Sequence, residues 1–117
     1  MNDYVLDACA LFALLQDEPG ADKVADVINS AKNGTAKVIM NKTNLLEVYY
    51  DTFRYRGKAQ ADTMLHGFKK LPVIVNDVMT DEIFNEAGRL KASYRISLAD
   101  SLALAQAYVV RCPFANR

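Results

Sequence analysis

Three acidic residues stand at positions in the sequence where carboxylates can do chemistry. Asp7 ends a short apolar run, Glu47 follows a second apolar run, and Asp100 lies in the first turn of the last predicted helix. Hard divalent cations such as Mg²⁺ and Mn²⁺ prefer oxygen ligands, typically one or two carboxylates together with water and substrate phosphate. Carboxylates that converge repel one another unless a proton or a cation offsets their charge. The set therefore indicates a cation site able to polarise a phosphodiester and activate a water molecule.

Each acid also has a structural interpretation: Asp7 directly precedes a helical segment, whose first amides a carboxylate can cap. Ser97 and Asp100 have the spacing of a capping box, and an acid in a first turn also suits the helix dipole. Glu47 belongs to a polar stripe at helical spacing, a pattern typical of a solvated face. The other members of this stripe are Asn44, Asp51 and Arg54. Taken singly, each acid leaves both interpretations open, and only the set favours function.

Short apolar runs alternate with stretches of helical periodicity along the chain. Strands are expected over Tyr4–Leu6, Lys37–Met40 and Val73–Val75. These runs are continuously apolar, as in parallel sheets covered by helices on both faces. We predict one α/β domain over residues 1–117 with a central parallel sheet. Helices are expected over residues 9–16, 21–32, 42–56, 59–70, through 83 to about 94 with Asp77 or Thr80 as the cap, and 98–110.

Composition limits the classes of protein to which the chain belongs. The formal net charge is zero, so nucleic-acid binding would have to come from a local patch. The longest apolar run, residues 8–15, is far shorter than the ~20 residues that span a bilayer, and no signal sequence opens the chain. Cys9 and Cys112 lack metal-ligand spacing, and Cys9 is expected to be a small buried residue. A single histidine, His66, excludes multi-histidine metal sites, so we expect a reduced, cytoplasmic protein without membrane contact.

Three segments resemble the PIN domain family, and within it the VapC-type toxin ribonucleases. They are the opening YVLDACALFALLQDEPGADKV, the central NLLEVYY and the late YRISLADSLALAQA. The resemblance covers nearly the whole chain and implies a PIN-like three-layer α/β/α fold. Asp7, Glu47 and Asp100 match the first three acidic residues of the family, which coordinate Mg²⁺ or Mn²⁺. By this resemblance Asp7 and Asp100 are direct metal ligands, Glu47 completes the acidic pocket, and Ser97 holds the start of the last helix.

The resemblance also implies an activity and a partner. The family cleaves single-stranded or loop RNA by metal-dependent hydrolysis, which leaves a 5′-phosphate and a 3′-hydroxyl, and an antitoxin encoded alongside silences each toxin. The chain is thus expected to be the endoribonuclease toxin of a VapBC-type pair. A haloacid-dehalogenase-type phosphatase also begins with a strand-end aspartate, but it needs a second acid two residues later, where Cys9 stands.

The C-terminus departs from the family pattern. The family carries a further acidic residue at the end of a strand after the last helix, whereas this chain ends with Phe114, Ala115, Asn116 and Arg117. We therefore expect a domain short at its C-terminus, with the last strand missing or incomplete and the fourth acid absent. The alternative function is an inert, truncated PIN fold that binds an antitoxin or itself. An unpaired strand edge favours self-association, so a homodimer is expected.

Two other groups of residues are candidate contact surfaces. Arg54, Arg56 and Lys58 surround an aromatic residue and are candidate RNA contacts, although cations at a helix end also suit the helix dipole. Acids after the third strand, which are equally good helix caps, are candidates to compensate for the missing one: Asp77, Asp81 and Glu82. An apolar face of the third helix is either core or the surface that receives an antitoxin or a second copy: Tyr49, Tyr50 and Phe53.

Overall fold

A parallel three-stranded sheet lies at the centre of the computed structural model, which describes residues 2–111. Within this range the strands are β1 (Asn2–Val5), β2 (Ala36–Asn41) and β3 (Val73–Asn76), in the order β1-β2-β3. Both pairings are parallel, with Tyr4 opposite Val38 on one side of β2 and Val73 opposite Val38 on the other. The predicted parallel sheet is confirmed.

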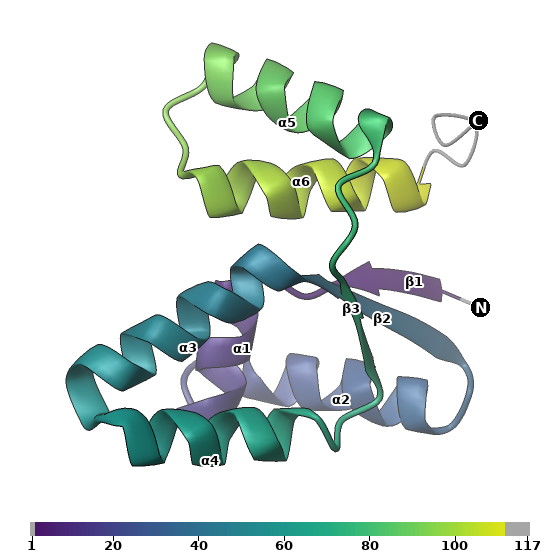
Figure 1. The fold of residues 1–117 in the computed structure, drawn as a ribbon. Helices are drawn as coiled ribbons and strands as arrows, with labels where there is room; N and C mark the ends of the chain where they lie inside the picture. The colour runs from purple at the N-terminus through teal and green to yellow at the C-terminus, as the bar shows by residue number, and fades with distance from the viewer. Residues whose placement is uncertain (1, 112–117) are drawn as a thin grey trace.

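Helices cover the sheet on both faces, as predicted (Figure 1). Two of them lie on one side, where α6 contacts β1 and β2, and the others lie on the opposite side, where α2 and α3 contact β2. None of the helices found between residues 2 and 111 has the length and apolar character that crossing a membrane needs. The helices are α1 (Ala8–Leu15), α2 (Ala21–Lys32), α3 (Lys42–Arg56), α4 (Lys58–Phe68), α5 (Asp81–Ser93) and α6 (Leu98–Arg111).

Side-chain hydrogen bonds fix where several helices begin. The Asn41 carboxamide accepts a hydrogen bond from the Thr43 amide at 2.9 Å, so α3 starts directly at the carboxyl end of β2. The Thr80 hydroxyl accepts from the Ile83 amide at 3.2 Å and caps α5. Of the two expected caps for this helix, Thr80 therefore serves and Asp77 does not.

The hydrophobic core has two parts. The larger part joins the sheet to α1, α3 and α4, and the smaller part lies between α5 and α6. Since α5 packs mainly on α6, the position of α6 determines where this helical pair stands relative to the sheet (Figure 1). The fully buried large hydrophobic side chains are Leu11, Val38, Met40, Val48 and Ile83.

Two predictions about burial are wrong. The apolar run at Tyr4–Leu6 was expected to form a buried strand, yet Tyr4 on β1 is 39% exposed while Val38 on β2 is 1% exposed. The reason is position, because β1 lies at an edge of the three described strands and β2 lies between its neighbours. Cys9 was expected to be buried but is exposed, because Ala8 and Leu11 occupy the inner face of α1. The segment where the last strand was expected to be missing or incomplete, residues 114–115, lies outside the described residues.

Candidate active site

Asp7 stands immediately after β1 and caps α1. The Leu6 amide donates to the Ile39 carbonyl at 2.8 Å, so strand pairing continues up to the residue before the acid. The Oδ1 atom of Asp7 accepts a hydrogen bond from the Ala10 amide at 2.8 Å. A carboxylate has two oxygens and about four lone-pair positions, so this one bond leaves room for a cation. Capping and metal ligation are thus compatible roles for Asp7.

Asp100 lies in the first turn of α6, where Ser97 organises the backbone. The Ser97 hydroxyl accepts a hydrogen bond from the Asp100 amide at 3.0 Å, and the Ser97 carbonyl accepts from the Ser101 amide at 3.0 Å. The Asp100 side chain is exposed. Asp7 and Asp100 line one open groove of about 440 Å³, together with Cys9 and residues of α6. The structure therefore brings two acids, 93 positions apart in the sequence, to one hollow.

Glu47 on α3 belongs to the same acidic region. Burial raises the pKa of its carboxyl above the ordinary value, and the negative charges of Asp100, Asp51 and Asp7 raise it further. Like charges shift a pKa in this way only when they lie close enough to interact. Asp51 was first assigned to the polar stripe alone, although its spacing of one helical turn from Glu47 was a usable signal. The acidic region thus holds four carboxylates rather than three.

Asn44 was also assigned to the polar stripe, and the structure places it in the interior. Its side chain is fully buried, and its Nδ2 atom donates to the Ala99 carbonyl at 3.2 Å. Its Oδ1 atom is buried without a hydrogen-bond partner among the described residues. This side chain connects α3, one turn before Glu47, to α6, one residue before Asp100. No pattern in the sequence distinguished it from the exposed members of the stripe.

The donors present suit a hard divalent cation. Asp7, Asp100 and Glu47 offer carboxylate oxygens, the ligands that Mg²⁺ and Mn²⁺ take, and one or two carboxylates with water suffice for Mg²⁺. Within residues 2–111, however, no three His, Cys, Asp or Glu side chains converge tightly enough to form a complete metal-binding group. The residues present therefore fit a cation held by Asp7 and Asp100, with Glu47 near it and water completing its coordination.

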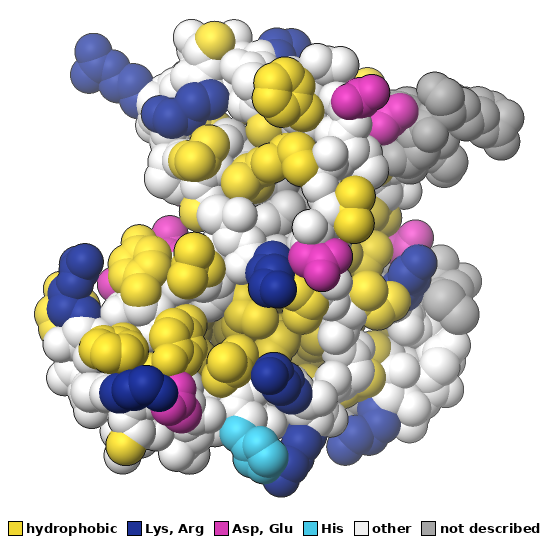
Figure 2. All heavy atoms as spheres, in the orientation of Figure 1, with side chains coloured by type: hydrophobic (Ala, Val, Ile, Leu, Met, Phe, Trp, Pro, Cys, Tyr) yellow, Lys and Arg dark blue, Asp and Glu magenta, His cyan; other side chains and the backbone are white. Residues whose placement is uncertain are grey.

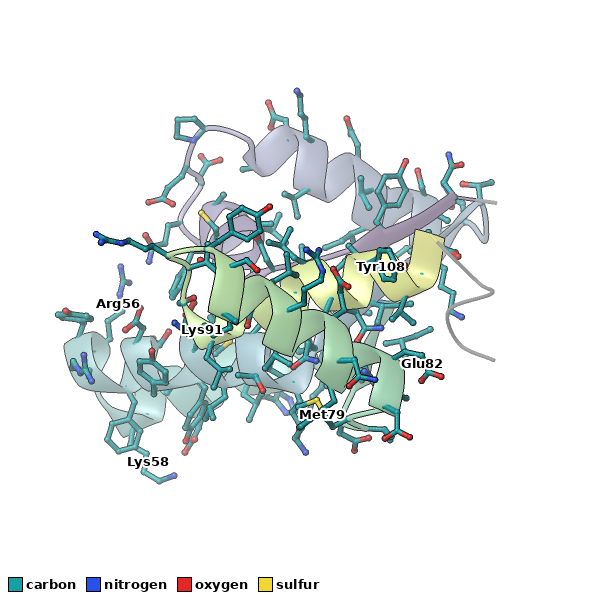
Figure 3. All side chains as sticks on the ribbon, turned by 90° about the horizontal axis from the view of Figure 1, so that it is seen from above. Arg56, Lys58, Met79, Glu82, Lys91 and Tyr108 are labelled. Atoms are coloured by element: carbon teal, nitrogen blue, oxygen red, sulfur yellow. The ribbon has the colours of Figure 1, made fainter. Side chains whose placement is uncertain are left out.

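The three basic side chains considered as RNA contacts, those of Arg54, Arg56 and Lys58, lie in different surroundings. The Arg54 guanidinium lies over the Tyr50 ring, 5.6 Å from its centroid. Lys58 forms an ion pair with Asp62 at 2.5 Å. Arg56 instead lines a groove with α1, and in Figure 3 it extends in a different direction from Lys58.

Two of the acids considered as compensation, Asp81 and Glu82, are not brought to the site. Asp81 and Glu82 open α5, which runs antiparallel to α6, so they lie beside the C-terminal half of α6 (Figure 1). Asp100 lies at the opposite end of that helix, which is ~20 Å long. The first acidic residues of α5 therefore do not join Asp7 and Asp100.

Known proteins similar to this chain indicate its family and its fold. The family model described as "PIN domain" matches residues 4–115. Among solved structures, the chain resembles the crystal structure of VapBC2 from Rickettsia felis bound to a DNA fragment from their promoter. The TM-score is 0.63 at 18% identity, over 97% of this chain and 94% of that chain, a level that shows shared fold. No match was found among curated proteins.

Proposed function

The chain belongs to the PIN domain family, and on that basis we propose that it is a metal-dependent endoribonuclease, the toxin of a VapBC-type toxin–antitoxin pair. One observation carries the proposal. Asp7 and Asp100 share an open groove, and both raise the pKa of Glu47. Acids gathered at the carboxyl edge of a parallel sheet, where ligands of such folds bind, suit a bound cation and a phosphodiester.

In this proposal Asp7 and Asp100 hold Mg²⁺ or Mn²⁺, and Glu47 completes the acidic pocket. The cation, when bound, supplies polarisation of the phosphodiester and an acidified water molecule. Glu47, a carboxylate close enough to interact with Asp7 and Asp100, is the side chain we assign to accept a proton from the attacking water. Ser97 holds the backbone beneath Asp100, so the ligand keeps its place at the start of α6. The products are a 5′-phosphate and a 3′-hydroxyl.

A protein antitoxin and a second copy of the chain are the proposed partners. The similar Rickettsia felis structure is a VapBC complex, which supports an antitoxin partner. Figure 2 shows hydrophobic side chains gathered over α3, where Leu46 is 56% exposed and Tyr50 and Phe53 are each 44% exposed. We assign this face to contact with the antitoxin or with a second copy. A toxin acting on cellular RNA works in the cytoplasm.

Cleavage of single-stranded RNA by the purified protein tests the proposed activity. We expect cleavage in Mn²⁺, and its loss in EDTA or in Asp7→Asn. Since Asn caps helices as well as Asp does, Asp7→Asn removes the charge while the start of α1 is retained. Asp22→Asn, at an exposed position in the first turn of α2, is the matched control and should cleave normally. Cleavage that persists equally in EDTA would show the mechanism to be wrong.

The alternative function, a catalytically inert binding module, is favoured by one observation. No complete three-residue metal-binding group forms among residues 2–111. Titration of Mn²⁺ by calorimetry separates the two functions, because the nuclease should bind the cation and lose that binding in Asp100→Asn. A wild-type protein that binds no Mn²⁺ at millimolar concentration would favour the inert module.

A further inference from the structure

A mixed polar and apolar groove leads away from the acidic site along α1. Cys9, at the wall of the Asp7–Asp100 groove, also lines a second hollow of about 370 Å³ between α1 and α3. That hollow shares four residues with a third, of about 190 Å³, which reaches α4. Cys9 is common to the first two hollows and four residues are common to the last two, so the three hollows lie next to one another along α1, and we call this row of hollows the groove. The four shared residues are Phe12, Gln16, Thr52 and Arg56.

The groove is long enough to hold nucleotides of an RNA strand beyond the phosphodiester that is cleaved. Cys9 on α1 and Gln16, the residue that follows the last turn of α1, mark its two ends, and a helical step of seven residues covers ~10 Å. Successive nucleotides of a stacked strand are ~3.4 Å apart along the axis. A single strand whose phosphodiester lies between Asp7 and Asp100 would therefore continue past Cys9 towards Arg56.

The side chains at the far end suit a nucleic acid strand. Arg56 offers a planar guanidinium, which binds phosphate through two parallel hydrogen bonds. Tyr55 is 77% exposed and offers a ring on which an unpaired base can stack. Thr52 donates its hydroxyl hydrogen to the Val48 carbonyl at 2.8 Å, and Gln16 supplies an amide. This combination of one cation, one aromatic ring and neutral polar groups matches single-strand recognition.

Two acids also line the second hollow, and their positions matter. Asp51 lies one turn after Glu47, and its negative charge raises the pKa of the Glu47 carboxyl. Asp51 therefore belongs to the acidic end of the groove, where a bound cation would offset its charge. Glu18 lies close to the end of α1 and opposes phosphate binding there. The Arg56 side chain, which is positively charged, lines both the second and the third hollow, so it is the side chain positioned to attract a phosphate.

We propose that the groove from Cys9 to Arg56 binds the single-stranded RNA segment that adjoins the cleaved bond, with Arg56 on a phosphate and Tyr55 against a base. This subsite rests on the proposed ribonuclease function and deepens it. Arg54 is directed to the Tyr50 ring, although it stands only two residues from Arg56. Two residues turn a helix by about 200°, so the two arginines face opposite sides of α3.

The two arginines provide a matched experiment on the whole chain. Arg56→Gln and Arg54→Gln are compared in Mn²⁺-dependent cleavage of a single-stranded RNA of random sequence. We expect KM to rise about tenfold in Arg56→Gln, with kcat changed less than about twofold, since a contact kept in ground and transition states affects binding alone. The slope of log KM against log salt should fall by about 0.7, as expected for one lost phosphate contact on a single strand. Arg54→Gln should match the wild type in both respects.

Further variants and outcomes complete the test. Glu18→Gln should lower KM, because it removes a negative charge beside the phosphate, and Tyr55→Ala should raise it. Equal KM values and salt slopes for Arg56→Gln and Arg54→Gln, with an active wild type, would overturn the subsite and leave the ribonuclease function intact. A wild type that neither binds nor cleaves RNA in Mn²⁺ would overturn both. Thermal melting curves of the variants, expected to coincide because both arginines are exposed, verify that folding is unchanged.

Discussion

Asn44 on α3 donates a hydrogen bond from Nδ2 to the carbonyl oxygen of Ala99 on α6, at 3.2 Å across 55 positions of sequence. Glu47 follows Asn44 by nearly one helical turn, and Asp100 follows Ala99 directly. The bond therefore ties together the two helices that carry two of the candidate catalytic acids. Because Asn44 is fully buried, this connection is shielded from competition with water.

Replacing Asn44 should reduce stability. Asn44→Ala removes the donor to Ala99 and leaves a small cavity, so the free energy of unfolding should fall by about 1–3 kcal/mol. Urea denaturation measures this value, and an unchanged m would show that the denatured state is unaffected. Lys42→Ala, exposed in the first turn of the same helix, is the control and should change stability by less than about 0.5 kcal/mol. Equal stabilities of the two variants would contradict the assigned role.

Glu47 should make stability depend on pH in a defined direction. A carboxyl whose pKa is raised on folding costs stability when it ionises, so the cost is absent below the ordinary value of 4.5 and complete above the raised one. In EDTA, Glu47→Gln should therefore melt at a higher temperature than the wild type at pH 7. At about pH 3.5, where the carboxyl is protonated in both states, the melting temperatures should converge.

Glu86 gives the control of opposite sign for this experiment. The Arg89 guanidinium, bonded to it at 2.5 Å, lowers the pKa of the Glu86 carboxyl. The contribution of the ionised Glu86 carboxyl to the stability of the folded protein is present above the ordinary pKa and is lost as pH falls through the lowered pKa. Glu86→Gln should thus lower the melting temperature at pH 7, where Glu47→Gln raises it. If both variants shift the melting temperature in the same direction, the assigned environment of Glu47 is wrong.

Divalent cations should stabilise the folded protein through the acidic site. A ligand that binds only the folded state raises the free energy of unfolding by about 2.7 kcal/mol when its concentration is 100 times its Kd. Mn²⁺ should therefore raise the melting temperature of the wild type. Asp100→Asn should abolish this rise, while the Ser97 hydroxyl still caps α6 through the backbone amide. Asp81→Asn, on α5 away from the groove, should retain it. A rise that survives in Asp100→Asn would place the cation elsewhere.

The thiol of Cys9 should react in the native protein. Cys9 is exposed and lines both the Asp7–Asp100 groove and the neighbouring hollow. In a Cys112→Ser background, an aromatic disulfide reagent should modify Cys9 without denaturant, and the bulky adduct should block RNA cleavage. The double variant with Cys9→Ser should keep its activity in the presence of the reagent. Modification of Cys9 that leaves cleavage unchanged would show that the substrate does not pass this residue.

The order of the elements and the starts of several helices were predictable from the sequence. Each strand was visible as a short apolar run and each helix as a repeat of apolar residues, because these signals are local. Asn41, Thr80 and Ser97 cap helices whose first amides lie two or three residues away, so sequence spacing alone identified them as candidates. The position of Asp7 at a strand end was also predictable, because it directly follows the apolar run Tyr4–Leu6.

The tertiary structure alone decided which of the locally equivalent side chains face the site. Helical periodicity groups residues on one face of a helix, but it does not reveal the element against which that face packs. Asn44 and Arg54 share the polar stripe of α3, yet α6 covers one while the other lies over Tyr50. Arg56 faces a groove because α1 packs against α3, a contact between segments about 40 residues apart. Such long-range packing also exposed Cys9, since the inner face of α1 was occupied by other residues.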